Sequence, residues 1–562
     1  MERIWLKHYP AGVPADVDVD QYSSLVELFE TGFRQYAKRN AYAFMGRYFS
    51  FADLDRDSAA FGAWLQSRGL QPGTRVALMM PNIVQYPIAL AGVLRAGCVV
   101  VNVNPLYTPR ELEHQLKDSG AEAIVILENF AATLQQVIDR TAVKHVVVAS
   151  IGDLLGFPKG ALVNFALRRV KKMVPAWSLP GHTRFCAALD EGARRKLQPV
   201  TLTPRDVAFL QYTGGTTGVS KGATLTHRNL VANVLQMEAW VGPKLHDTSR
   251  GPVPEQFVYI CALPLYHVFA LTVNCLFGIR HGTLNVLIAN PRDIPAFVKE
   301  LQKVHFHVLP GVNTLFNALA ENEEFRKLDF SSLRVANGGG MAVQQAVSDK
   351  WQKITGIPII EGYGLSESSP VATSNPADAT EYTGTIGLPF PNTEIAILDD
   401  AGQPVPLGTP GEIAIRGPQV MAGYWNRPDE TAKVMTPDGY FKSGDVGVMD
   451  ERGYIRIVDR KKDMIIVSGF NVYPNEVEGV IASHPGVLEC AAIGVPDERS
   501  GEAVKVFVVR KDPALTEDAL QEFCRQNLTG YKKPKYVVFR DDLPKSNVGK
   551  ILRRELRGPT GP

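Results

Sequence analysis

The sequence contains few cysteines, and they are scattered along it. The six cysteines lie mostly among apolar residues and form no Cys-x-x-Cys pair. This spacing argues against a disulfide framework and against a zinc site. The first residues, MERIWLKHYPAG, also lack the apolar segment of a secretory signal. We therefore expect reduced, buried thiols in a cytoplasmic protein.

An excess of charge of one sign is also missing. Lys and Arg total 60 and Asp and Glu total 58, which leaves a formal net charge of +2. The composition therefore gives no support to a nucleic-acid-binding function. One uncharged run, residues 257–279, is about as long as a membrane span. Because Pro264, His267 and Asn274 interrupt this run, we interpret it as a core strand followed by a core helix.

The chain has 562 residues, too many for one hydrophobic core, so we expect two or more domains. Alternating strands and helices predict an α/β fold with two β/α subdomains, at about residues 1–200 and 201–383. Short strands with Gly and Pro turns over residues 384–459 predict a small distorted β-barrel. The last hundred residues form a separate, small α+β unit.

The most informative stretch is residues 211–222, QYTGGTTGVSKG. Glycines let backbone N–H groups approach an anion, hydroxyl groups donate to phosphate oxygens, and Lys221 neutralises charge. An apolar run at residues 207–210 predicts a strand before the loop, and Thr226 is placed to cap a helix after it. The pattern is neither a Walker A loop nor GxGxxG. It predicts a loop that holds a polyphosphate.

This loop resembles the phosphate loop of the adenylate-forming superfamily of acyl-CoA synthetases, luciferases and peptide-synthetase adenylation domains. Further motifs follow in the order of that family, and together they cover about residues 211–556. They are VANGGGMA at 335–342, EGYGLSESSP at 361–370, DGYFKSGDVGVMDERGYIRIVDRKKD at 438–463, SGFNVYPNEVE at 468–478 and LPKSNVGKILRREL at 543–556. Within the superfamily the chain resembles the bacterial long-chain fatty acid–CoA ligases. Gly338 departs from the family pattern, which often has serine there.

The resemblance implies a site for ATP and AMP. In it Tyr363 stacks on the base, the Asp445 carboxylate accepts the ribose hydroxyls, and Mg²⁺ binds Glu367 and Thr213. The implied nucleotide-binding residues are Thr213, Gly214, Gly215, Thr216, Thr217, Lys221, Gly339, Gly340, Tyr363, Gly364, Ser366, Asp445 and Arg460.

The catalytic residues implied by the resemblance are Lys550, Glu367 and His267. A lone histidine in an apolar run is more often a hydrogen-bonded core residue, but His267 matches the PLYH/PMFH motif at the acyl pocket of the family. A lysine among arginines near a C-terminus is usually a surface charge. Lys550, however, matches the lysine of the closing G-K-x-x-R/K motif, which enters the active site.

The resemblance also divides the chain into functional parts. It implies an AMP-binding adenylation domain at residues 1–459, a hinge at 460–463 and a mobile C-terminal domain at 464–562. Lys462 is the implied hinge residue. Ser468, Gly469 and Phe470 are the implied coenzyme A contacts.

The implied reaction joins a fatty acid to coenzyme A through an acyl-adenylate, consumes ATP with Mg²⁺ and releases AMP and pyrophosphate, for fatty acid activation and β-oxidation. The apolar stretches 257–279 and 304–316 favour a long acyl chain, while an aryl or short-chain acid stays open. An acyl-carrier protein as acceptor is disfavoured, because no inserted segment precedes the hinge. A noncatalytic lipid carrier is the competing hypothesis, and it predicts loss of ionic residues that are all present.

Residues 154–177, LLGFPKGALVNFALRRVKKMVPAW, set four basic side chains beside apolar ones. Such a stretch can lie on an anionic bilayer, and a solvated helix packed on its own domain fits equally well. Peripheral contact with the inner membrane is therefore a hypothesis. The oligomeric state stays open, with a homodimer among the alternatives.

Overall fold

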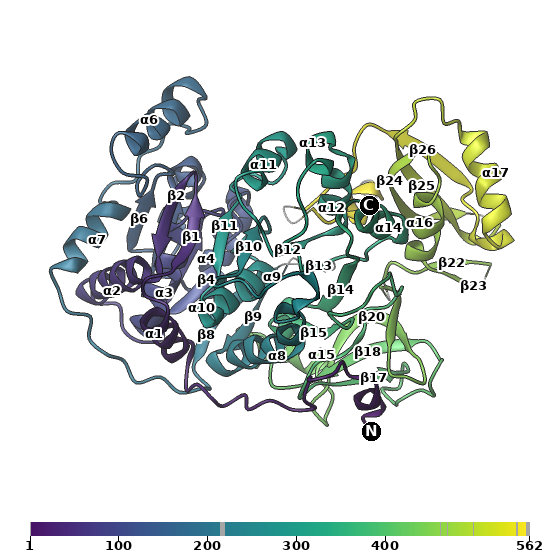
Figure 1. The fold of residues 1–562 in the computed structure, drawn as a ribbon, viewed down its shortest axis with the longest axis horizontal. Helices are drawn as coiled ribbons and strands as arrows, with labels where there is room; N and C mark the ends of the chain where they lie inside the picture. Colours follow the sequence, from purple (N-terminus) through teal and green to yellow (C-terminus); the bar gives the residue numbers. More distant parts are fainter. Residues whose placement is uncertain are drawn as a thin grey trace.

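The computed structural model describes residues 2–213, 220–460, 462–468, 470–497, 499–546 and 549–557, except for the side chain of Arg460. The strands in these ranges form four sheets. Figure 1 shows three of the sheets within one large part and the fourth, with its helices, in a smaller part at the carboxyl end. The structure therefore confirms the predicted fold, a large α/β domain followed by a small one.

The first sheet carries the strand that leads into the glycine-rich loop. Its inner strands pair in parallel, and the outermost pairings at β8–β9 and β9–β19 are antiparallel. In spatial order it consists of β19 (Gly423–Tyr424), β9 (Lys221–Thr226), β8 (Val207–Thr213), β4 (Val99–Asn102), β3 (Arg75–Met79), β5 (Ala123–Leu127), β6 (His145–Ala149) and β7 (Thr183–Arg184).

The second sheet supplies another wall of the cavity that is described below. It is parallel from β1 through β14 and antiparallel at both ends. Its order is β16 (Leu388–Pro389), β15 (Val371–Ser374), β14 (Ile359–Gly364), β13 (Val335–Gly338), β12 (Val308–Gly311), β10 (Val258–Cys261), β11 (Leu284–Leu287), β1 (Asn40–Phe44) and β2 (Arg47–Ser50).

The predicted subdomain boundary near residue 200 does not separate these two sheets. Strands β1 and β2 cross into the second sheet, where β1 pairs with β11, and β8 and β9 complete the first sheet beside β4. A sequence pattern shows that a strand is buried but not which strand it pairs with. The exchange of strands between the two sheets could therefore not be predicted from the periodicity.

The smaller sheets follow in sequence order. The third, antiparallel and four-stranded, corresponds to the predicted small β subdomain and contains β17 (Glu394–Leu398), β18 (Gly411–Arg416), β20 (Phe441–Met449) and β21 (Ile455–Arg460). The fourth belongs to the small part and contains β22 (Ile465–Val467), β23 (Phe470–Val472), β24 (Val487–Asp497), β25 (Gly501–Arg510) and β26 (Tyr536–Arg540).

Helices cover the sheets and begin where the capping residues are. Thr108 caps α4 by accepting the Glu111 N–H, and Thr226 caps α8 by accepting the Asn229 N–H. The helices of the large part are α1 (Leu25–Gln35), α2 (Phe51–Ser67), α3 (Gln85–Arg95), α4 (Pro109–Ser119), α5 (Ala131–Gln135), α6 (Lys159–Phe165), α7 (Phe185–Ala193), α8 (His227–Leu245), α9 (Val268–Ala270), α10 (Phe277–His281), α11 (Ile294–Leu301), α12 (Asn313–Glu321), α13 (Glu323–Arg326), α14 (Gln345–Thr355) and α15 (Pro428–Val434). The small part has α16 (Pro474–Ala482), α17 (Glu517–Asn527) and α18 (Arg553–Leu556).

Residues 257–279 form a strand and then a helical segment, as predicted: β10 is followed by α9, a π-helical turn at Leu271–Leu276 and α10. In the described ranges, no helix combines the length and apolarity needed to cross a membrane. All six cysteines are free thiols; Cys186 is half-buried and the others are buried.

Candidate active site

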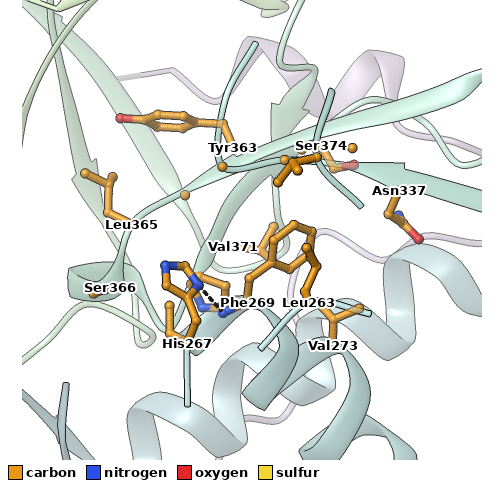
Figure 2. Close-up of a pocket in the computed structure, with 18 of the residues that line it drawn as sticks. Leu263, His267, Phe269, Val273, Asn337, Tyr363, Leu365, Ser366, Val371 and Ser374 are labelled. Atoms are coloured by element: carbon orange, nitrogen blue, oxygen red, sulfur yellow. Dashed lines mark hydrogen bonds between the residues drawn. The ribbon is translucent and has the colours of Figure 1, made fainter. Parts of the chain in front are cut away.

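A cavity of about 410 Å³ opens where the two large sheets, the third sheet and the small part meet. One end carries most of the charged and hydroxyl groups, and the other is mostly apolar. Figure 2 shows Tyr363, Ser366 and His267 on one side, Leu263 and Val273 on the other, and Phe269 between them. Leu365 lies with the first group and Asn337 with the second. The polar end is lined by Thr213, Lys221, His267, Ser366, Glu367, Tyr424, Ser443, Asp445, Lys462 and Lys550.

The glycine-rich loop connects two strands of a hairpin at this polar end. Thr213 at the end of β8 and Lys221 at the start of β9 are register partners. The predicted residues Gly214, Gly215, Thr216 and Thr217 lie outside the described ranges. Lys221 forms an ion pair with Glu430, and its Nζ lies 5.0 Å from the centre of the Tyr424 ring. A cation is therefore held beside the hairpin by a carboxylate and an aromatic face.

Glu367 lies in a short 3₁₀ turn after β14 and lines the cavity although it is nearly buried. Its Oε1 accepts the Tyr424 hydroxyl at 2.8 Å. Burial, together with this carboxylate, raises the pKa of Tyr424, so the phenol stays a donor. The Tyr424 hydroxyl therefore fixes the orientation of the Glu367 carboxylate at the cavity.

The predicted pair for base and ribose is brought together. The Tyr363 hydroxyl donates to Asp445 Oδ2 at 2.7 Å, and both residues line the cavity. Asp445 is the register partner of Arg460 in the β20–β21 pairing. The Ser443 hydroxyl accepts the Asp445 N–H at 3.1 Å, which fixes the backbone at the carboxylate.

The glycine-rich stretch at the end of β13 forms a wall of the cavity through Gly338, Gly339 and Gly340. A Cβ at Gly338 would lie 2.6 Å from a methyl group of Val343 and 2.7 Å from one of Ile359. A serine there would point into the core and meet these side chains. In this chain the departure from the family pattern is therefore a matter of packing. Gly364 and Ser366, at the end of β14 and after it, also line the cavity.

His267 lies at the junction of the two ends and is the N-cap residue of α9. Its Nδ1 accepts the Phe269 N–H at 3.3 Å, drawn as a dashed line in Figure 2. Burial lowers the pKa of His267 to about 4, and the charge of Lys550 adds to the effect. The ring is therefore neutral near pH 7, with its proton on Nε2.

Lys550 reaches the cavity from the small part of the molecule. Its N–H donates to the Ser546 hydroxyl at 3.1 Å, and the carbonyl of neighbouring Gly549 accepts the Thr314 hydroxyl at 3.0 Å. Lys462, the predicted hinge residue, lines the same cavity. Three lysines from separate motifs thus converge on one site.

The predicted coenzyme A residues are not among the described residues that line this cavity. Ser468 donates its N–H to Ser500 O at 2.7 Å, and the exposed Phe470 ring stacks on Tyr531 with 4.8 Å between centres. Gly469 lies outside the described ranges. In the observed domain orientation Ser468 and Phe470 therefore face their own small part.

Three residues around the site were missed by sequence reasoning: Tyr424, Glu430 and Phe269. Tyr424 and Glu430 both lie in the stretch GYW-x-RP-x-E at residues 423–430. Its aromatic and acidic residues were the signal from which a contact with Lys221 could have been predicted. Phe269 is two positions after His267, and its ring lies 3.1 Å from where a Cβ of Gly339 would be.

Comparison with known proteins gives the family. The AMP-binding enzyme model matches residues 29–425, and the AMP-binding enzyme C-terminal domain model matches residues 476–550. The chain is 57% identical over 558 residues to a long-chain-fatty-acid–CoA ligase of Escherichia coli O6:H1, covering 99% of this chain and 98% of that protein. It is 58% identical, with the same coverage, to a long-chain-fatty-acid–CoA ligase of Yersinia pestis. The crystal structure of ATP-bound MatB from Rhodopseudomonas palustris is 28% identical, with a TM-score of 0.78 and coverage of 95% of this chain and 98% of that chain.

A two-part α/β fold with a cavity between its parts agrees with the two AMP-binding enzyme models and with the fold of MatB. The chain belongs to the AMP-binding enzyme family.

Proposed function

We propose that this protein joins a long-chain fatty acid to coenzyme A in two steps. The fatty carboxylate attacks the α-phosphate of ATP, which forms an acyl-adenylate and releases pyrophosphate. The thiol of coenzyme A then attacks the acyl carbon and displaces AMP. The observation that carries the proposal is a single cavity with three lysines at one end and apolar side chains at the other. The curated names of the relatives that match the full chain support it.

The difficulty of the first step is bringing a carboxylate to a highly charged anion. Lys221, Lys462 and Lys550 line the polar end and offset that charge. Lys550 enters from the small part, and we assign it the position between the carboxylate and the α-phosphate. Positioning and charge neutralisation then carry most of the catalysis.

In the described part of the chain, no group of three or more His, Cys, Asp or Glu side chains is arranged so that it could hold a metal ion. Mg²⁺ commonly binds one or two carboxylates and takes its other ligands from substrate phosphates and water. Glu367, with Thr213 on the same wall, fits this pattern. We therefore propose that these two residues hold Mg²⁺, which would neutralise phosphate charge when bound.

The neutral His267 ring suits a hydrogen-bond donor better than an acid–base catalyst. Its Nδ1 is occupied by the Phe269 N–H, which leaves Nε2–H to donate. We propose that this proton orients the carboxylate or acyl oxygen at the junction of the two ends.

The acyl chain would occupy the apolar end. Helix α8 contributes one side of that end, and strands β10 and β12 contribute another. Asn337 lies on this side as well. The apolar side chains there include Met237, Trp240, Val241, Leu245, Tyr259, Leu263, Phe269, Val273, Val308 and Val312. A lining without charged groups favours an alkyl chain over a polar acid.

For the second step we propose that the small domain rotates about the hinge at Lys462. In the observed orientation Lys550 occupies the site, while Ser468 and Phe470 lie away from it. Rotation would withdraw Lys550 and bring the Ser468–Phe470 strand to the thiol. This exchange explains why both sets of residues belong to one reaction.

We also propose that the segment around α6 touches an anionic membrane surface. Five of the thirteen exposed large apolar side chains in the described ranges lie between residues 157 and 173. Arg169, Lys171 and Lys172 are exposed beside them. In Figure 1 α6 projects from the edge of the large part, away from the small part. Delivery of fatty acids from the cytoplasmic face of the inner membrane to β-oxidation would fit this arrangement.

A homodimer stays a prediction, which sedimentation velocity can test.

The proposed ligase reaction is tested by product analysis of the full-length protein with ATP, Mg²⁺, palmitate and coenzyme A. We expect palmitoyl-CoA, AMP and pyrophosphate in equal amounts, and loss of all three with excess EDTA. Lys550→Ala should slow acyl-adenylate formation by about 10²- to 10³-fold, the scale of a lost oxyanion contact. Lys535→Ala, a surface lysine of the same small part, is the matched control. Palmitate binding without AMP release would instead support the carrier hypothesis.

A further inference from the structure

An arginine whose side chain is only partly exposed, Arg553, lies at the junction between the large and small parts. It donates to Glu478 Oε1 at 2.9 Å and Oε2 at 2.7 Å, to Asn475 Oδ1 at 2.5 Å and to Asp459 Oδ1 at 3.3 Å. Asp463 Oδ2 is 3.6 Å away. Three carboxylates thus surround the guanidinium group of a side chain that is 15% exposed.

These partners come from both sides of the predicted hinge. Asp459 lies in β21 of the third sheet and is fully buried, immediately before residues 460–463. Asn475 and Glu478 lie in α16, and Arg553 in α18, both in the small part. Asp459 Oδ2 also accepts the Asn475 N–H at 2.9 Å. One carboxylate of the large part therefore holds two residues of the small part.

The same arginine is linked to Lys550 through a short, well-bonded segment. Ser546 N–H donates to Lys550 O at 2.7 Å, and Leu552 N–H donates to Pro544 O at 2.8 Å. Arg553 follows directly after this segment. Fixing the guanidinium therefore fixes the backbone that carries Lys550.

We propose that Asp459, Asn475 and Arg553 form a latch that holds the small domain in the orientation in which Lys550 occupies the site. Arg553 is in this sense a positioning residue for the first half of the reaction. The inference rests on the proposed two-step function, since it assigns the latch to one of the two steps.

The geometry separates the contacts that must break from those that persist. Glu478 and Asn475 move with Arg553 in any rotation of the small domain, so the guanidinium keeps these partners. Of the partners of Arg553 named here, Asp459 is the one in the third sheet. Opening the latch therefore breaks the hydrogen bonds from Arg553 and from the Asn475 N–H to Asp459, whereas a structural role within the small part needs Glu478 and Asn475 alone.

Loss of the arginine would remove the cation that Asp459 and Glu478 share. Asp463 would keep Arg557, whose Nη2 lies 3.0 Å from Oδ1, and the like charges of Asp459 and Glu478 in a poorly hydrated site would repel. The repulsion would push the small domain away from the observed orientation.

The test compares the two half-reactions in Asp459→Asn and Arg553→Met. We expect palmitate-dependent pyrophosphate release to fall about tenfold or more, because a small misplacement of a reacting group is costly. Conversion of supplied palmitoyl-adenylate and coenzyme A to palmitoyl-CoA should change less than about twofold. The double variant should be no slower in pyrophosphate release than Arg553→Met alone.

Glu476→Gln is the matched control, because it removes a carboxylate of α16 whose partner, Lys532, is within the small part. In this variant the ratio of the rates of the two half-reactions should equal that of the unmodified protein. If both half-reactions of Asp459→Asn fall in parallel, or if neither changes, the latch is refuted. Should Asp459→Asn fold poorly, Asp459→Glu keeps the charge, displaces the carboxylate and should show the same split more weakly.

A distance measurement separates the latch from the proposed function. Spin labels at the exposed positions 323 and 518 report the separation of the large and small parts. We expect Asp459→Asn to shift or broaden this distance distribution, and an unchanged distribution contradicts the latch even if the chain proves to have another activity. Absence of pyrophosphate release from the unmodified protein would instead refute the ligase function alone.

Discussion

Glu361 is a buried carboxyl group beside the glycine-rich wall, and its Oε1 accepts the Val343 N–H at 3.1 Å. Burial raises the pKa of Glu361 from an ordinary 4.5 to about 8. The unfolded chain therefore releases this proton at lower pH than the folded chain. The stability associated with the group is present below pH 4.5 and is lost as the pH rises toward 8.

Glu361→Gln removes this dependence because an amide does not ionise. We expect the unfolding free energy of the variant relative to the unmodified protein to increase with pH by roughly a few kcal/mol between pH 5 and 8. Urea denaturation at both pH values measures it. A difference that is the same at both pH values would show that Glu361 is not buried as a neutral acid.

Gly549, next to Lys550, has a φ of +81°, and a Cβ there would lie 2.9 Å from Thr314 Oγ1. Gly549→Ala should therefore displace Lys550 and slow pyrophosphate release by about tenfold or more. Gly530→Ala is the matched control, since nothing lies within 4 Å of a Cβ there. Equal rates in both variants would contradict this packing of the small domain.

Single residues were predictable where their chemistry was contained in a motif. Lys221, Glu367, Asp445 and Lys550 lie in separate motifs and line one cavity. Their roles stay predictions. Arg553 and Asp459 gave no comparable signal, because their significance comes from a contact across 94 positions of sequence.

At the scale of elements, the segment around α6 carries the membrane prediction. Replacing all four basic residues of 168–172 by Gln should abolish binding to vesicles of anionic lipid. Arg168 donates to Glu128 at 2.9 Å and to Ser150 at 3.0 Å, so Arg168→Gln alone should retain most of the binding. Vesicle cosedimentation measures both. Unchanged binding of the fourfold variant would rule out this surface.

The sequence predicted elements better than their pairing. Strand β8, the cap of α8 at Thr226 and the strand-then-helix order of residues 257–279 are as expected, because apolar runs and capping residues are local signals. The placement of β1 beside β11 was not predictable, since nothing in a five-residue apolar strand specifies its neighbour.

At the scale of the whole molecule, three histidines couple folding to pH; His227 is buried, and His267 and His307 are half-buried. Nδ1 of His227 accepts the Leu25 N–H at 3.2 Å, and Nδ1 of His307 accepts the Val258 N–H at 3.0 Å. His267 makes the equivalent bond to Phe269. Burial lowers the pKa of each ring to about 4.

Because the unfolded rings bind protons near pH 6.5, their contribution to stability is present above that value and is lost as the pH falls toward 4. His227→Asn keeps a hydrogen-bond acceptor at the position of Nδ1 and cannot titrate in this range. We expect the loss of unfolding free energy between pH 7 and 4.5 to be smaller in this variant by about 1 to 3 kcal/mol. Identical losses in the variant and the unmodified protein would contradict the neutral buried ring.

The account as a whole claims that one cavity activates long-chain acids and passes them to coenzyme A. The most direct test measures pyrophosphate release with ATP, Mg²⁺ and acids from acetate to oleate, each with and without coenzyme A. We predict rates that rise with chain length and strong stimulation by coenzyme A. Pyrophosphate release that does not change when coenzyme A is added would contradict the proposed ligase. The absence of release with every acid of the series would also contradict it.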